Sequence, residues 1–140
     1  MADTLSHWIK AFSDCEIPVL YKSKRRIHDL QENEQDITVS VLTEVARLDP
    51  GFSISLLRHI GRSTKKEITT LSHAISLISI PLVIKMLNDL PTLEEVLDEN
   101  TVPGILNEYF RQYQTAFMAR EWSVLRKESE NNEIYTATLN

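Results

Sequence analysis

The side chains that most often hold metals or act as nucleophiles are scarce in this sequence. Its 140 residues include four histidines and one cysteine, which are His7, His28, His59, His73 and Cys15. No histidine has a second one three or four positions further on, the spacing that places two metal ligands on one helical face. A single cysteine excludes an internal disulfide bond and a zinc site built on cysteines. We therefore expect no metal ion and no other cofactor.

The histidines are better explained by structural roles than by catalysis. His28-Asp29 is the dipeptide on which metal-dependent phosphohydrolases build their sites, but its neighbours offer no second ligand. We predict an exposed His28 without a metal. His59 lies near a predicted helix end, where a positive charge would complement the helix dipole. His73 precedes an apolar helical face and is predicted to be half-buried.

No arrangement in the sequence activates a nucleophile. Cys15 lacks a histidine partner, and no GxSxG turn is present. We predict that Cys15 is a small buried apolar side chain. The acidic pairs Glu94-Glu95 and Asp98-Glu99 occupy adjacent positions, which do not face each other on a helix. We interpret both pairs as solvated and expect the protein not to be an enzyme.

Two clusters of basic residues could bind phosphate groups, one at residues 22–26 and one at residues 58–66. Either cluster could hold a nucleotide, a cyclic dinucleotide or RNA, or could form a solvated helix face balanced by nearby acids. The candidate phosphate-binding or interaction residues are Lys24, Arg25, Arg26, Arg58, Arg62 and Lys65. The net charge of −5 and the absence of interleaved aromatic residues disfavour nucleic acid as the ligand.

The elements that position these residues are predicted to form one domain, residues 1–140. Only 3 glycines and 5 prolines are present, which disfavours the many turns of an all-β fold. No apolar run approaches the roughly 18 residues that a membrane span requires. The first residues lack the pattern of a signal peptide. We predict a protein of a reducing cytoplasm that does not contact a membrane.

Hydrophobic residues recur at helical intervals along nearly all of the chain. The predicted helices span residues 4–13, 21–30, 39–48, 50–60, 71–78, 81–90 and 105–128. Residues 17–20 are predicted to be extended, and the chain ends within a further apolar pattern at 134–139. These observations predict a compact all-α bundle of about eight helices that cross obliquely.

Local signals predict where several of these helices begin and end. Thr38 is a predicted N-cap, and Asp49-Pro50 combines a capping side chain with a proline at the first helical position. Gly61 is a predicted C-cap. Thr92 and Glu95 have the spacing of a capping box, in which each side chain bonds the other residue's backbone N–H.

The longest helical pattern in the sequence, at residues 105–128, has apolar residues along one side. One side of it contains Leu106, Tyr109, Phe110, Tyr113 and Phe117. Further apolar residues extend this surface towards the end of the chain. Those predicted to be exposed as a contact surface are Trp122, Leu125, Tyr135 and Leu139.

The order of motifs resembles the HDOD family of bacterial signalling domains, which are non-catalytic relatives of the HD phosphohydrolases. The chain reads Ile17-Pro18-Val19-Leu20, then Asp49-Pro50, then Ser55-Leu56-Leu57-Arg58, and finally a segment from Ile68 to Ser79. The family pattern reads LPxLP, DPxLsxxLLrxaNS and IxSixxAIxxLG. The resemblance covers about residues 17–125, is loose in the last third, and implies an HDOD-like helical fold.

The chain departs from the family pattern at three places. Gly61-Arg62 replaces the usual Asn-Ser, and Ser79 stands where the family often has glycine. Residues 109–112 lack the histidine of the family's WxHS-like segment. Residues 133–137 resemble the approach to the segment equivalent to the enzymes' His-Asp pair. The resemblance implies that residues 17–140 are the N-terminal part of such a domain, truncated at its C-terminus.

Two functions remain open from the sequence. The first is a non-catalytic regulatory module of bacterial signal transduction, as the resemblance implies. Its partners would be other signalling proteins, a missing C-terminal lobe of its own, or a second copy. The second is a domain that binds nucleotides or cyclic dinucleotides, or retains phosphohydrolase activity, and uses the two basic clusters.

Overall fold

The computed structural model describes residues 15–64, 68–127 and 130–139, and these ranges contain eight helices. The helices are α2 (Tyr21–Glu32), α3 (Val39–Leu48), α4 (Pro50–Ser63), α5 (Leu71–Ile78), α6 (Ile80–Asp89), α7 (Leu93–Val96), α8 (Val102–Leu125) and α9 (Asn131–Leu139). The described ranges contain no strand, only an isolated parallel bridge between Val19 and Thr92. The predicted all-α fold is therefore confirmed. The helix predicted at 4–13 lies outside the described residues.

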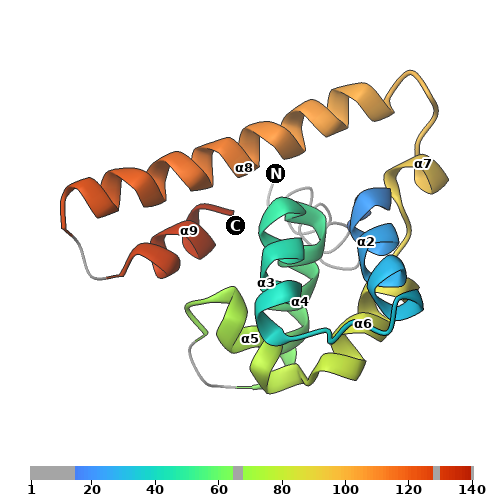
Figure 1. Ribbon diagram of the computed structural model, residues 1–140. Coiled ribbons are helices and arrows are strands. Elements are labelled where there is room, and N and C mark those ends of the chain that lie inside the picture. Colours follow the sequence, from blue (N-terminus) through green and yellow to red (C-terminus); the bar gives the residue numbers. More distant parts are fainter. Residues whose placement is uncertain (1–14, 65–67, 128–129, 140) are drawn as a thin grey trace, which may run out of the picture.

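The helices form a body that is crossed at one end by a long helix (Figure 1). Helices α2 to α7 make up the body, α8 lies across it, and α9 folds back against α8. The core is formed mainly where α3, α4 and α5 pack together. Its fully buried side chains include Ile27, Leu42, Phe52, Leu56, Ile75, Val83 and Leu87.

The predicted helix starts are confirmed by their hydrogen bonds. The Thr38 hydroxyl accepts a hydrogen bond from the backbone N–H of Val41, which caps α3. Asp49 caps α4 by accepting from the N–H of Phe52 at 3.1 Å. The capping box at α7 is also present. Each cap satisfies N–H groups that the first helical turn leaves without intrahelical partners.

Three predicted boundaries are wrong by about one turn, and one of them is the end of the long helix, which lies at Leu125 rather than at residue 128. Gly61 does not end α4, which continues to Ser63, because the Thr64 N–H still bonds the carbonyl of Ile60 at 2.9 Å. The long helix begins before Gly104, at Val102, because the Asp98 carboxylate already caps the preceding turn. Proline is compatible with this first turn because it needs no N–H partner there.

Helices α5 and α6 meet at Ser79 with a bend of 102°. Ser79 adopts φ 84° and ψ 145°, a backbone region that residues other than glycine rarely occupy. No described helix is by itself long and apolar enough to cross a membrane, although α5 and α6 together satisfy a test of length and composition. Both helices bury apolar residues in the core.

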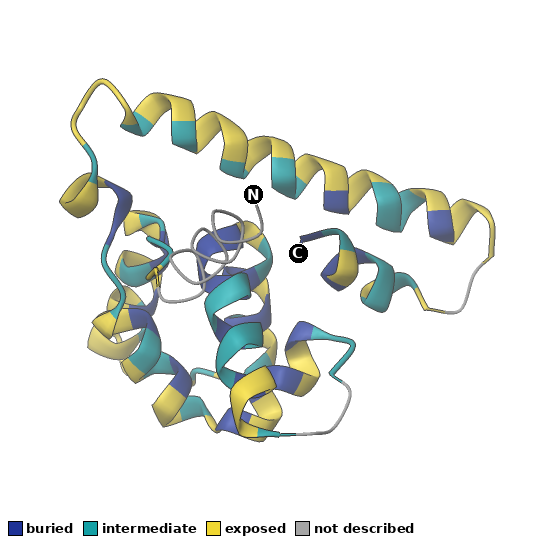
Figure 2. Cartoon of the chain, turned by 180° about the vertical axis from the view of Figure 1, so that it is seen from behind, coloured by how far each residue is buried: buried dark blue, intermediate teal, exposed yellow. Residues whose placement is uncertain are grey.

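The apolar face predicted for some helices is only partly buried. Leu48 and Leu82, which belong to the apolar patterns of α3 and α6, are exposed by 48% and 40%. The deviation is largest on α8, where only Ala116 and Ser123 are buried among 24 residues. Figure 2 shows α8 exposed along most of its outer surface. Most apolar side chains of α8 are therefore accessible to solvent.

Candidate functional site

Helix α8 carries most of the exposed apolar surface in the described part of the chain. Twelve large apolar side chains are exposed there, and seven of them belong to α8. These seven are Leu106, Phe110, Phe117, Met118, Trp122, Val124 and Leu125. Scattered exposed apolar residues are normal on soluble proteins, whereas a concentration on one element marks a contact surface.

Part of this surface lines a groove between α8 and the body. Two hollows adjoin there, with volumes of about 400 Å³ and 220 Å³, and both are lined by Leu48 and Tyr113. We call the combined feature the α8 groove. Its apolar lining consists chiefly of Tyr21, Leu48, Leu106, Phe110, Tyr113 and Phe117.

Three aromatic rings form a row along the α8 side of the groove. The ring centroids of Phe110 and Tyr113 lie 6.5 Å apart, and those of Tyr113 and Phe117 lie 6.2 Å apart. These spacings are in the range of favourable aromatic pairs. Residues three and four positions apart lie on the same helical face, so the row follows the helix axis.

A hydrogen bond from α8 to the body fixes the groove at its first end. The Tyr109 hydroxyl donates to the carbonyl oxygen of Pro18 at 2.6 Å. Gly51 lies directly beneath this pair, and a Cβ atom there would overlap the Pro18 oxygen and lie 2.8 Å from the Tyr109 hydroxyl. Burial, with the nearby Asp49 carboxylate, raises the pKa of Tyr109 well above its usual value. Tyr109 therefore remains a donor at neutral pH.

The buried carboxylate of Asp49 connects three segments beneath the groove. Its Oδ2 atom accepts from the Leu20 N–H at 2.8 Å and from the Ser23 hydroxyl at 2.7 Å. Its Oδ1 atom accepts from the Phe52 N–H. Burial raises the pKa of Asp49, while these hydrogen bonds act in the opposite direction. Asp49 thus serves as a structural junction between residues 17–20, α2 and α4.

The second end of the groove contains two arginines. Arg47 and Arg120 line the smaller hollow together with Glu44. Arg47 bonds the Asn132 side chain and lies 5.3 Å above the Tyr135 ring. Burial raises the pKa of Tyr135 to about 12, although both arginines act in the opposite direction.

Of the four residues predicted to be exposed as an apolar contact surface, two are exposed and two are buried. Trp122 and Leu125 are exposed by 65% and 79%, as expected, and with Met118 they form an outer strip of α8. Tyr135 and Leu139 are instead buried, at 3% and 0% exposure. The chain reverses direction after α8, so α9 packs its apolar side inwards and Tyr135 donates to the Arg47 carbonyl.

The two basic clusters lie at separate places. Arg25 and Arg26 line one hollow of about 270 Å³, and Arg58 and Arg62 line another of about 320 Å³. Lys65 lies outside the described residues. Lys24 donates one hydrogen bond to the Asn88 carbonyl at 3.0 Å.

The arginines of these clusters also have partners within the chain. Arg25 and Arg26 pair with Asp29 and Glu44, at 3.9 Å and 3.2 Å. Arg58 donates to the carbonyl of Cys15 at 3.0 Å. The described geometry therefore favours a solvated, internally paired helix face for the first cluster, and it does not bring the two clusters into one site.

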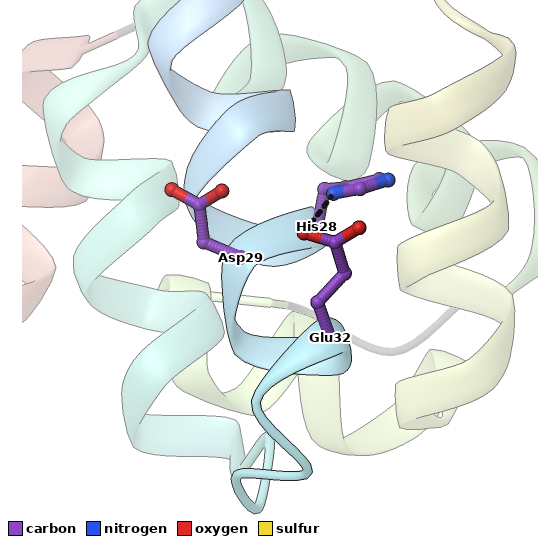
Figure 3. A group of neighbouring side chains, drawn as sticks. All are labelled: His28, Asp29 and Glu32. Atoms are coloured by element: carbon purple, nitrogen blue, oxygen red, sulfur yellow. Dashed lines mark ion pairs between the residues drawn. The ribbon is translucent and has the colours of Figure 1, made fainter.

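The remaining chemically capable residues lie on the surface. Figure 3 shows His28, Asp29 and Glu32 on one exposed side of α2, with His28 Nδ1 3.5 Å from Glu32 Oε2. The expectation that His28 has no second potential ligand nearby is therefore wrong. Three exposed side chains on one short helix are equally well explained as an ordinary i, i+4 pair with a neighbouring acid.

Two predictions about burial are also wrong. Cys15 is exposed rather than buried, because it precedes the extended segment and does not face the core. His73 is exposed, because Leu71, Ala74 and Ile75 occupy the inner face of α5. His59 is partly buried in the penultimate turn of α4.

Sequence periodicity placed Phe110, Tyr113 and Phe117 on one side of the long helix but did not predict a groove there, and it missed the opposite side altogether. That side comes from Tyr21 and Leu48, which lie far from α8 in sequence. Each was counted as part of an ordinary helix, and only the chain's tertiary arrangement places them opposite Phe110. Comparisons with protein-family models, curated proteins and solved structures found no match to this chain.

Proposed function

We propose that this chain is a non-catalytic protein-interaction module that binds its partner in the α8 groove. The observation that carries this proposal is the open aromatic row of Phe110, Tyr113 and Phe117. Hydrophobic and aromatic side chains in a concave site supply most of the favourable free energy in protein recognition. None of the other hollows described above is lined by so many large apolar side chains.

The resemblance to HDOD domains supports a role in bacterial signal transduction. At Ser79, where that family often has glycine, the backbone has a φ of 84°. Such a φ is natural for glycine and strained for serine. The geometry at this position is thus compatible with the motif pattern, so we propose a regulatory signalling module as the setting for the groove.

The alternative of nucleotide binding receives less support from the structure. The two basic clusters line different hollows, and the Arg25–Asp29 and Arg26–Glu44 pairs already balance part of the charge. A thermal-shift panel of cyclic dinucleotides tests it directly. We expect no stabilisation that depends on Arg25, Arg26, Arg58 or Arg62.

The interaction proposal is tested by peptide display on the purified protein. The library consists of helical peptides of about 18 residues with apolar residues at every third or fourth position and Ala, Gln, Glu or Lys elsewhere. We expect recovered peptides to bind at least about tenfold more weakly to Phe110→Ser than to the natural chain. Trp122→Ser, a change of similar size on the outer strip, is the control and should retain binding.

Two results would contradict the proposal. One is a selection that recovers no binding peptide. The other is a set of binders whose affinity is insensitive to Phe110→Ser or depends equally on Trp122. Phe110 and Trp122 are both more than half exposed, so neither substitution removes core packing.

A further inference from the structure

We infer that the partner of the α8 groove is an amphipathic helix with a carboxylate at the end that reaches Arg47 and Arg120. This inference rests on the proposed function and adds the chemistry and polarity of the occupant. It has two foundations, which are the length of the groove and the charge at its second end.

The length of the groove suits a helix of several turns. Its lining extends along α8 from Leu106 to Arg120. At a rise of 1.5 Å per residue this distance is about 21 Å. Two adjoining hollows that together span this length along one helix match the side of an amphipathic helix that presents anchors at i, i+3 or i+4, and i+7.

The two ends of the groove differ in charge. At the first end, Lys22 and Glu94 carry opposite charges. At the second end, Glu44 pairs with Arg26 and Glu121 pairs with Arg120. Arg47 has no carboxylate within 4 Å among the described residues, so the second end has an excess of one positive charge. A negative group on the partner would complement it.

Arg120 also has a hydrogen-bond donor that the chain does not use. Its Nε atom is buried and has no hydrogen-bond partner, the only such buried side-chain atom in the described residues. The neighbouring hollow is lined by Tyr113 and Phe117 and also by Glu44 and Arg47. Because the Nε atom itself is closed off from solvent, a carboxylate in the hollow would interact with the positive charge of the Arg120 side chain, which is 34% exposed, rather than accept a hydrogen bond from Nε.

The experiment compares charge variants of the protein with the peptides recovered from the display library. Glu, Gln and Lys are equally available in the library, so enrichment of one of them reflects binding. We expect an acidic residue to be enriched at one end of the peptides that bind. Changing that Glu to Gln should weaken binding about tenfold. Arg120→Glu should weaken binding of the acidic peptides by a similar factor and should improve binding of peptides with Lys at that position.

Arg111→Glu provides a matched control on the same helix. Arg111 is exposed outside the groove and pairs with Glu108. We expect its reversal to change affinity by no more than about twofold. The gain for Lys peptides on Arg120→Glu also shows that a weakened interaction with acidic peptides does not come from misfolding.

Each outcome separates this inference from the broader proposal. Binders that depend on Phe110 but show no acidic preference would overturn the carboxylate and leave the groove as the interaction site. Equal effects of Arg120→Glu and Arg111→Glu on the affinity for acidic peptides would likewise overturn the carboxylate and leave the groove as the interaction site. A concentration-dependent dimer that dissociates in Phe110→Ser would show that a second copy fills the groove, and would overturn the helical partner. The absence of any binder would remove both proposals.

Discussion

At the scale of single residues, the first end of the groove depends on how closely two backbone segments approach. Gly51 lies in the first turn of α4, beneath the Pro18 carbonyl that accepts from Tyr109. Its φ is not positive, so the requirement for glycine comes from space rather than from backbone conformation. Asp49, two residues earlier, holds the same two segments together through its carboxylate.

We predict that Gly51→Ala destabilises the protein by about 2 kcal/mol or more, because the new Cβ would overlap the Pro18 oxygen. Gly61→Ala is the control, since a Cβ there meets nothing within 4 Å and Gly61 lies inside α4. Alanine should stabilise that position by about 0.5–1 kcal/mol through its higher helix propensity. Chemical denaturation measures both, and equal effects at the two glycines would contradict the close approach.

Asp49 makes a prediction about pH. Its pKa is raised above the ordinary 3.8, so between 3.8 and the raised value the native state holds a proton that the unfolded state has lost. The contribution of Asp49 to stability therefore falls as pH rises through that window. Asp49→Asn does not titrate at this position, so the natural chain should lose stability relative to the variant over the same range.

The pH measurement is a denaturation series from about pH 3 to pH 7 on both proteins. Glu95 and Asp98 have lowered pKa values, caused chiefly by hydrogen bonds with Thr92 and Thr101. The contributions of Glu95 and Asp98 to stability increase as pH rises. They are the same in both proteins, so they cancel in the difference in stability between the natural chain and the variant. If the natural chain instead gained stability relative to the variant as pH rose, the hydrogen bonds to Asp49 would outweigh its burial.

At the scale of elements, the bend between α5 and α6 is strained at one residue. Ser79 has φ 84°, where a side chain is unfavourable. We predict that Ser79→Gly stabilises the protein by about 1 kcal/mol. Ser76→Gly, in the exposed middle of α5, should destabilise it by about 0.5–1 kcal/mol because glycine is a poor helix former. Thermal and chemical denaturation compare the two, and destabilisation by Ser79→Gly would contradict the strain.

The elements also show which features could be predicted from sequence. The caps at Thr38, Asp49 and Thr92 were predicted correctly because each signal and its hydrogen-bond partner lie within four residues. The burial of Tyr135 was missed because it depends on how the chain turns after α8. The groove was not predicted: periodicity grouped Phe110, Tyr113 and Phe117 on one helical side, but the opposite side comes from helices more than fifty residues earlier in the chain.

At the scale of the whole molecule, α8 has one side that packs in the interior and another side whose apolar residues are exposed. Its inner side, with Ala116 and Ser123, is buried beneath α9 and the body. Phe110 and Phe117 of the aromatic row and the outer strip remain exposed, whereas Tyr113 is partly buried against the core. Figure 2 shows the long exposed side of α8. The body supplies Tyr21 and Leu48 opposite the row, so the groove exists only in the assembled fold. This is why substitutions that disturb the junction at Asp49 or Gly51 should also weaken peptide binding.

The central claim is that this groove, rather than the outer strip or the basic clusters, is where the partner binds. The most direct measurement is a backbone-amide NMR titration of the isotope-labelled protein with an acidic helical peptide recovered by display. We predict the largest shift changes at Tyr21, Leu48, Phe110, Tyr113 and Phe117, with little change at the indole N–H of Trp122. Largest changes around Trp122 and Leu125, or around Arg25 and Arg62, would contradict the account.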